Sequence, residues 1–454
     1  MKKRVVSILM ACALMFSTVA CGSSTESNET SESTSEENTT TEESKEGGEK
    51  TLIRFQTWNP GTEAYVAEMI EEFEDQHPDI DVEHTYMPYA DHVEKLKVDL
   101  SAGDAADVFG VQTGSMYNEF RDFEENLAPY MAEKYGDDWL SNYNDYAMSL
   151  LETEDGGYYA MPLGLSYAGY VWANVSYFEK YNLEVPTNYD ELKAVAQEFR
   201  ANGEYPLVIG AKDSWINIDT WMNIAADVNA EKLYSAIEGE TPFTDAELVE
   251  SFKIWQNCFT DGVFQDGALG VNMYVDSTDM YQKEGSVPMI LNGSWALGAY
   301  MDSDAQSQEV YNGEASNHKV FLMDWNNDGK IAPVAEAVDV SLAINNQSEV
   351  KEAAWIFVDW MLNEGADFLI NGHLQYLPAR NDMELNVVGL NENGSENMAF
   401  CVEQGKTNVG GYREMAYAEL KEVIINELTL LALGDTTPED AAAAIEAASQ
   451  AQSR

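Results

Sequence analysis

The segment from Thr51 to Ser115 alternates between strand and helix patterns, and this alternation constrains the fold more than any other feature of the chain. The apolar run 52–55 has the length of a strand, and Val66 to Phe73 then carry apolar residues at helical spacing. Two further strand patterns follow, separated by a second helix pattern that ends at Gly103. Strands that alternate with helices in this way predict a parallel α/β sheet.

Polar loops follow the first and the third of these strands. In a parallel α/β sheet, ligands bind at the loops beyond the carboxyl ends of the strands, which lie along one edge. Side chains that follow two of the strands are therefore expected to meet in one wall of a cleft. The candidate binding residues of this wall are Trp58, Asn59, Gln112 and Thr113.

A second region of the same kind begins near residue 156. Short strand patterns lie at 158–162, 170–173 and 206–209, with a helix pattern between the last two that opens with a capping box at Thr187. The chain has 454 residues, more than one hydrophobic core usually serves. We therefore expect this region to form a second α/β lobe, which carries a polar loop at residues 215–219.

The first 50 residues are predicted to lie outside the fold. Basic residues precede an apolar run from Val5 to Val19, which is typical of an export signal. Residues 18–22, TVACG, resemble the bacterial lipobox, in which the cysteine, here Cys21, becomes the lipidated first residue of the mature protein. Residues 22–50 contain no aliphatic or aromatic side chain, so they are expected to form a disordered tether. Ordinary signal cleavage with a free secreted product is the alternative.

The charge balance narrows the choice of partners. The chain has 25 basic and 80 acidic residues, a formal net charge of −55. Such a charge repels nucleic acid and anionic membrane surfaces, so no nucleic-acid partner is expected. The same field favours a neutral ligand over an anionic one.

Catalytic motifs are not found in the sequence. Gly164 to Gly169 has one residue too many for a nucleophile elbow, and Gly405-Lys406-Thr407 lacks the upstream glycine of a phosphate-binding loop. None of the five histidines is paired at the spacing of a zinc hydrolase. We therefore expect no catalytic residue, no metal and no cofactor. A glycoside-degrading enzyme that uses two of the many carboxylates, or a passive surface adhesin, is the alternative.

Several other residues are expected to have structural roles. Asp324 to Ala335 begins like a calcium loop but ends in alanine instead of glutamate, so a plain Asn-Asp-Gly turn is favoured. Cys258 lies in a helical apolar pattern, which predicts a buried thiol that forms no disulfide with Cys401. Trp139 is expected in a solvated helical region, and Trp255 in the core.

The stretch from Lys283 to Trp295 has an apolar run of strand length, a turn at Asn292-Gly293-Ser294 and then the tryptophan. Taken alone, it allows either core packing of Trp295 or an aromatic platform at a cleft. The stretch also belongs to a series of motifs that resembles the family 1 extracellular solute-binding proteins, the carbohydrate-binding components of ABC importers. In chain order, these motifs are residues 158–162, 174–181, 185–192, 283–295, 343–344 with 353–357, and 434–441.

The resemblance implies an α/β, two-lobed periplasmic-binding-protein-like fold of type II, in which the chain crosses between the lobes three times. The crossings are expected near 162–170, 288–295 and 338–344, and Val338-Asp339 departs from the glycines that many relatives have there. The implied organisation is a signal peptide with lipobox (1–21), a tether (22–50), lobe one (51–165 and 290–340) and lobe two (166–289 and 341–454).

The resemblance also implies a function and further binding residues. Trp295 matches a tryptophan that stacks on sugar, and the other implied contacts are Tyr167, Trp215, Asp219, Tyr412 and Arg413. The protein is then expected to capture a neutral mono- or oligosaccharide and to deliver it to the permease subunits of an ABC importer. The expected location is the extracytoplasmic face of the cell membrane, with a lipid anchor on Cys21.

Overall fold

The computed structural model describes residues 50–58, 63–283, 287–300, 310–311, 314–315 and 317–453. The predicted signal peptide with Cys21, the predicted tether apart from its last residue, and Asn59 lie outside these ranges. Residues 48–454 form one compact unit, and the following description concerns that unit. Among the helices of the described ranges, none is long and apolar enough to cross a membrane.

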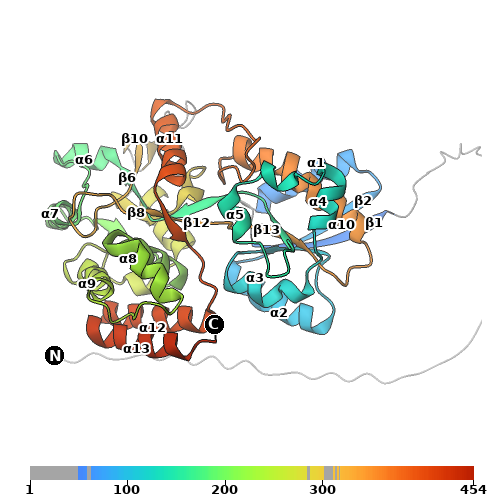
Figure 1. Ribbon diagram of the computed structural model, residues 1–454. Coiled ribbons are helices and arrows are strands. Elements are labelled where there is room, and N and C mark those ends of the chain that lie inside the picture. The colour runs from blue at the N-terminus through green and yellow to red at the C-terminus, as the bar shows by residue number, and fades with distance from the viewer. Residues whose placement is uncertain are drawn as a thin grey trace, which may run out of the picture. The chain divides into compact units, whose positions relative to one another are not determined.

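The first sheet has five strands in the order β2-β1-β3-β13-β4. The strands β1, β2 and β3 are parallel, whereas β13 runs antiparallel to both β3 and β4. The predicted alternation is confirmed, and Gly103 ends α2 in the left-handed conformation at φ 74°. The elements of this lobe are β1 (Thr51–Thr57), α1 (Glu63–Gln76), β2 (Ile80–Tyr86), α2 (Tyr89–Ala102), β3 (Val108–Val111), α3 (Ser115–Phe120), α4 (Ala128–Tyr135), α5 (Asp145–Ser149), β4 (Ala160–Pro162), β13 (Ser341–Ile344) and α10 (Lys351–Trp360), all labelled in Figure 1 except β3 and β4.

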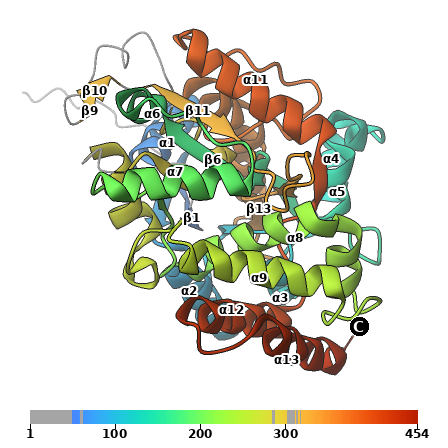
Figure 2. The same ribbon diagram turned by 90° about the vertical axis from the view of Figure 1, so that its left-hand side faces the viewer.

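The second sheet has four strands in the order β11-β6-β8-β7. Helices α8, α9, α12 and α13 pack together beside it, and Figure 2 shows α9 next to α12 and α13. The indole Nε1 of Trp255 in α9 donates to the carbonyl oxygen of Leu428 in α12 at 2.9 Å, which ties two of these helices together. The elements of this lobe are β6 (Tyr170–Asn174), α6 (Val175–Tyr181), α7 (Tyr189–Ala201), β7 (Leu207–Val208), α8 (Ser214–Ile237), α9 (Ala246–Thr260), β8 (Met289–Asn292), β11 (His318–Phe321), α11 (Glu392–Thr407), α12 (Ala418–Leu433) and α13 (Pro438–Ala451).

A third sheet, which we call the crossing sheet, has the order β14-β12-β5. Its strands are β5 (Ser166–Ala168), β12 (Val334–Ala337) and β14 (Val409–Tyr412). The strand β5 lies in the chain between β4 of the first sheet and β6 of the second, and β12 lies between β11 and β13. Two passages of the chain between the main sheets therefore run through the crossing sheet. The pair Gly410-Gly411 lies inside β14.

The strand pairing corrects the expected lobe boundaries. Segment 290–340 contributes β8 and β11 to the second sheet, whereas β13 and α10, expected in lobe two, belong to the first. The crossing expected near 288–295 is therefore wrong, because β8 pairs with β6 and β7. The chain instead passes from α10 of the first lobe to α11, which packs on β11. The passages between β4 and β6 and between β12 and β13 do lie at 162–170 and 337–341.

Local details also differ from the sequence-based expectations. Trp139 is buried, with its ring 5.3 Å from that of Tyr158, so the prediction of a solvated region is wrong there. The cap of α7 is Asn188, which accepts from the Glu191 backbone, one residue later than the expected capping box at Thr187. The predicted buried thiol at Cys258 is confirmed.

Candidate ligand-binding cleft

Arg413, immediately after β14, is the centre of the densest group of charges near the crossing sheet. Its side chain is only 6% exposed and lies among three carboxylates. Arg413 Nη2 is 2.9 Å from Asp219 Oδ2, and Nη1 is 3.0 Å from Asp339 Oδ1. Glu414 Oε1 lies 3.6 Å from Arg413 Nε. A buried guanidinium with such partners is held in one orientation, because each of its three nitrogens lies close to a carboxylate oxygen.

Asp339 connects the first lobe to this group. It lies between β12 and β13, in one of the passages between the sheets. Gln112, at the carboxyl end of β3, donates from Nε2 to Asp339 Oδ1 at 2.7 Å. The next residue, Thr113, has its backbone nitrogen 3.5 Å from the carbonyl oxygen of Val338. A single carboxylate thus bonds to a side chain at the first sheet and to Arg413 at the second lobe.

Aromatic rings of the second lobe lie against Arg413. Its Cζ atom is 4.4 Å from the ring centroid of Trp295 and 5.7 Å from that of Trp215, distances at which a guanidinium is attracted by the ring face. Trp215, in the first turn of α8, stacks on Tyr274 with ring centroids 5.7 Å apart. Trp215 and Trp295 meet edge to face at 6.0 Å.

Gly293 sets the position of the Trp295 ring. The tryptophan follows β8 in a short 3₁₀ turn (Ser294–Ala296), and its indole folds back over the glycine. A Cβ atom at Gly293 would lie 2.1 Å from the Trp295 ring, a separation too short for two non-bonded carbon atoms. Trp295 remains partly exposed, so a face of the indole is accessible.

Trp58 is held by a buried histidine of the first lobe. The ring of His92 lies 4.9 Å from that of Trp58, and Tyr89 meets Trp58 edge to face at 5.3 Å. His92 is fully buried, with Nε2 2.9 Å from the carbonyl oxygen of Gly110 and Nδ1 3.3 Å from Gln56 Nε2. Burial lowers the pKa of His92 to about 4, so the ring is neutral at physiological pH.

Three tyrosines come within reach of these charges. Burial, followed by negative charge that includes Asp339, raises the pKa of Tyr89 and of Tyr376, whereas Tyr274 is 58% exposed. Tyr89 starts α2, Tyr274 lies in a π-helical turn (Met273–Ser277) and Tyr376 lies between α10 and α11. None of the three was singled out from the sequence, because no local pattern marks them. In the sequence, Asp339 stood out only because many relatives have glycines at this place.

Among the acids of the cleft, Asp219 has the pKa that is shifted furthest from its usual value. Burial raises its pKa to about 7, while the opposite charge of Arg413 acts to lower it. Glu414 is different, since Lys421 Nζ at 2.7 Å and Arg413 together hold the pKa of that carboxyl below its usual value. Three carboxyl groups thus surround Arg413 and Lys421.

The structure brings some of the expected binding residues together and places others apart. Gln112, Trp215, Asp219, Trp295 and Arg413 form the connected group, with Trp58 and Thr113 on the first-lobe side.

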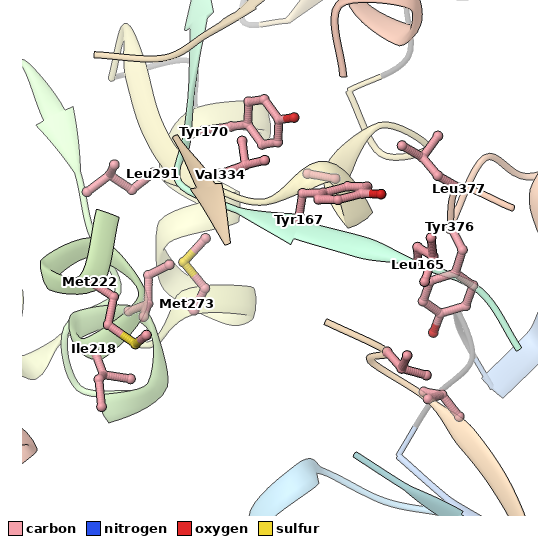
Figure 3. Close-up of a cluster of buried hydrophobic side chains, with 14 of the residues drawn as sticks. Leu165, Tyr167, Tyr170, Ile218, Met222, Met273, Leu291, Val334, Tyr376 and Leu377 are labelled. Atoms are coloured by element: carbon pink, nitrogen blue, oxygen red, sulfur yellow. The ribbon is translucent and has the colours of Figure 1, made fainter. Parts of the chain in front are cut away.

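Tyr167 and Tyr412 contact other groups. The ring of Tyr167 packs on Gly405 of α11 and lies in the apolar cluster of Figure 3. The hydroxyl of Tyr412 donates to Glu238 at 2.8 Å. Asn59 lies outside the described residues.

The loop from Asp324 was the other candidate for a ligand site. The carboxylate of Asp324 accepts the backbone N–H groups of Asp328 at 3.0 Å and Gly329 at 2.8 Å, as in a closed Asx turn. Asp227 of α8 accepts two more backbone N–H groups of the same loop. In the part of the chain that the structure describes, no group of three or more His, Cys, Asp or Glu side chains is placed to hold a metal ion. The geometry is that of the expected turn.

Two α/β lobes, a crossing sheet between them and a connected group of polar and aromatic side chains beside the crossings define the class of two-lobed solute-binding proteins with the type II periplasmic-binding-protein fold. The chain belongs to the bacterial extracellular solute-binding protein family, whose profile matches residues 58–367. This match confirms the resemblance found in the sequence motifs.

Known proteins of this kind are similar over much of the chain. The "Multiple sugar-binding protein" of Streptococcus mutans is 25% identical over 263 residues, 56% of this chain and 60% of that protein. The match thus spans less than two thirds of that relative's length.

The solved structures match a larger share of the chain than this sequence relative does. One described for xylan utilisation by Caldanaerobius polysaccharolyticus has a TM-score of 0.74 and 17% identity, and it covers 87% of this chain and 99% of that one. The ABC substrate-binding protein Lmo0181 of Listeria monocytogenes, in complex with cycloalternan, has a TM-score of 0.70 and 21% identity. This match covers 88% of this chain and 97% of that one.

Proposed function

We propose that this protein is a membrane-anchored lipoprotein that captures a neutral sugar or oligosaccharide in its cleft and delivers it to an ABC importer. The observation that carries the proposal is the pair Trp215 and Trp295, which lies against the guanidinium of Arg413. Gln112 of the other lobe is linked to Arg413 through Asp339. Sugars need flat apolar faces for their C–H side and fixed polar groups for their hydroxyls. The relatives named for sugar binding support the same ligand class.

The binding site in this proposal consists of the residues expected from the sequence. Most of the contacts with the sugar are assigned to the connected group. Trp58, Gln112, Thr113, Trp215, Asp219, Trp295 and Arg413 form its walls or hold them, and Asn59, the next residue after Trp58 in the sequence, is proposed to contribute as well. Tyr167 and Tyr412 contribute to the crossing sheet that carries the site. Capture brings the lobes together around the sugar, and the permease subunits then recognise the closed form.

Isothermal titration calorimetry against maltose, stachyose, xylotriose and glucuronic acid tests the proposal. We expect micromolar binding of at least one neutral sugar and no binding of glucuronic acid, because the carboxylates of the cleft repel it. Absence of heat with every neutral sugar would argue against sugar capture.

We infer that the cleft binds without catalysis. Two carboxylates that could act as acid and base, Asp219 and Asp339, are both ion-paired with Arg413. A glycosidase needs one carboxyl group free to donate a proton to the leaving oxygen. Chromatography of the sugar after long incubation should recover it unchanged, and shorter products would favour the enzyme.

The proposed anchor is the lipidated Cys21 at the start of the polar segment 22–50, which acts as a tether. We expect the full-length protein to sediment with membranes and the Cys21→Ser variant to remain in the soluble fraction. Equal sedimentation of both would contradict the anchor.

A further inference from the structure

A second cavity lies in the first lobe, at the end of the sheet away from the cleft. Its volume is about 410 Å³, and small-molecule pockets commonly measure roughly 300–1,000 Å³. Asn346 lines it just after β13, and the last residue of β13, Ile344, pairs with Val108 at the start of β3. Gln112 of the cleft follows the other end of β3. The length of β3 therefore separates this cavity from the cleft.

Glu124 is the buried acid of this cavity. The residue is 2% exposed, lines the cavity and forms an isolated antiparallel bridge with Asn345. Both of its carboxylate oxygens are without a hydrogen-bond partner among the described residues. Most buried polar side-chain atoms in proteins are bonded. The carboxyl group is thus placed to accept hydrogen bonds from a ligand inside the cavity.

The charges of the lining favour a positive ligand. Asp122, Glu124, Glu154 and Asp155 line the cavity together with one basic residue, Arg121. Burial raises the pKa of Glu124 well above its usual value, and the charge of Arg121 offsets this only in part. A further positive group beside the carboxyl would favour its ionised form.

An alkylammonium group suits these acids better than a metal ion does. Among the described residues, no group of three or more His, Cys, Asp or Glu side chains is placed to hold a metal ion. An ammonium group needs no such set of ligands, because each of its N–H groups bonds to a separate acceptor. Bonds between a charged donor and a carboxylate are also the stronger kind.

The outer wall of the cavity is held by bonds within the protein. The hydroxyl of Thr153 donates to Asp155, and the hydroxyl of Tyr159 donates to Asp155 Oδ2 at 2.9 Å. These bonds, that of Thr153 first, hold the pKa of Asp155 below its usual value, so this acid is ionised. Asn346 Nδ2 donates to the carbonyl oxygen of Asp122 at 2.9 Å. A charged, fixed rim thus lies outside the buried Glu124.

We propose that this cavity is a second ligand site, which binds a linear diamine. One ammonium group of the ligand donates to Glu124 at the buried end. The other lies among Asp122, Glu154 and Asp155, which are exposed and place the opening of the cavity at the surface. The site is separate from the cleft, so the inference does not depend on the proposed sugar capture.

Calorimetry on the full protein with 1,4-diaminobutane, 1-butylamine and 1,4-butanediol tests the site. Salt at about 150 mM screens the general attraction between cations and this acidic chain. We expect saturable binding of a single diaminobutane per chain. Butylamine should bind at least about tenfold more weakly, because it lacks the second charged contact, and butanediol should not bind.

Glu124→Gln should weaken diaminobutane binding at least about tenfold, because the charged acceptor is lost. Its ligand-free melting temperature should stay within about 2 °C of wild type, since none of the described residues loses a hydrogen bond to this side chain. Its affinity for a neutral sugar should be unchanged. Arg121→Met should instead strengthen diaminobutane binding, because it removes the positive charge of the lining.

Glu336→Gln is the matched control. Glu336 is also 2% exposed and also has a carboxylate oxygen without a partner among the described residues, but it lies in β12 and does not line this cavity. The variant makes the same change of charge and should bind diaminobutane as the wild type does.

The outcomes decide the inference without reference to the cleft. Absence of heat with diaminobutane, or equal binding of butanediol, would overturn the site. Equal affinities of wild type and Glu124→Gln, or an equal loss in Glu336→Gln, would show only diffuse attraction and overturn it too. Weaker binding by Arg121→Met would contradict the site whether or not Glu124→Gln folds. A wild type that binds diaminobutane but no sugar would overturn the proposed function alone.

Discussion

At the scale of single residues, the cleft depends on how a few side chains hold one another. Arg413 fixes the rings of Trp215 and Trp295 through their faces and fixes Asp219 and Asp339 through its N–H groups. Gly293 leaves room for the indole of Trp295 where any other residue would displace it. The binding surface is therefore rigid because of groups that need not touch the sugar themselves.

Trp295→Ala should abolish or greatly weaken sugar binding and should cost little stability. The indole is partly exposed and its N–H lacks a partner among the described residues, so its removal leaves no large dry cavity. Calorimetry and thermal unfolding measure the two effects. The control is Trp255→Ala, which removes a fully buried ring and should cost about 3–5 kcal/mol. A similar collapse of Trp295→Ala would place that tryptophan in the core.

Arg413→Ala should destabilise the fold as well as the site. It leaves Asp219 and Asp339 buried without their shared cation, and breaking a buried ion pair costs about 3–5 kcal/mol. Urea unfolding measures the loss. Lys253→Ala, which removes one partner of an exposed pair with Glu250, should barely move the midpoint. Equal midpoints for both variants would mean that the Arg413 pairs contribute nothing to stability.

At the scale of elements, the crossing sheet carries both the passages of the chain and the groups of the cleft. Strand β12 pairs with β5 on one side and β14 on the other, and each strand leads directly to a residue of the site or of a passage. Within β12, Glu336 is only 2% exposed and has one carboxylate oxygen without a partner among the described residues. A buried acid in the strand between the lobes makes the sheet sensitive to pH.

Glu336→Gln should remove part of the pH dependence of stability. Burial raises the pKa of Glu336 to about 7, above its value in the unfolded chain. The stabilisation it provides is thus complete at low pH and is lost as the pH rises through 7. The stability of the variant relative to wild type should increase by about 3 kcal/mol between pH 5 and pH 8. Urea unfolding at several pH values measures this, with exposed Glu154→Gln as control, and a constant difference would contradict it.

The elements also show how far sequence reasoning extends. Periodicity predicted β1, α1, β2, α2 and β3, because each pattern is local to its own element. It did not predict that β8 and β11 join the second sheet and β13 the first, since strand pairing is set by contacts far apart in the chain. For the same reason it indicated Gln112 from its place after a strand but did not predict the bond of Gln112 to Asp339, which lies 227 residues further along the chain.

At the scale of the whole molecule, the chain divides into a compact unit, Gly48–Arg454, and the segment before it. All contacts of the cleft lie within the compact unit. The family profile matches only residues in that unit as well. Capture of the ligand and attachment to the membrane are thus expected to be separable properties of the protein.

A chain that begins at Gly48 should therefore fold and bind as the full-length protein does. Its melting temperature and sugar affinity should match those of the Cys21→Ser variant, because none of the contacts among the described residues of the cleft and the two lobes is removed. Membrane sedimentation should be absent in both, and growth on the captured sugar should fall, since a freely diffusing binder is lost from the neighbourhood of the permease. A lower melting temperature of the shortened chain would show that the first 47 residues contribute to the fold, and undiminished growth would show that the anchor is not needed for delivery.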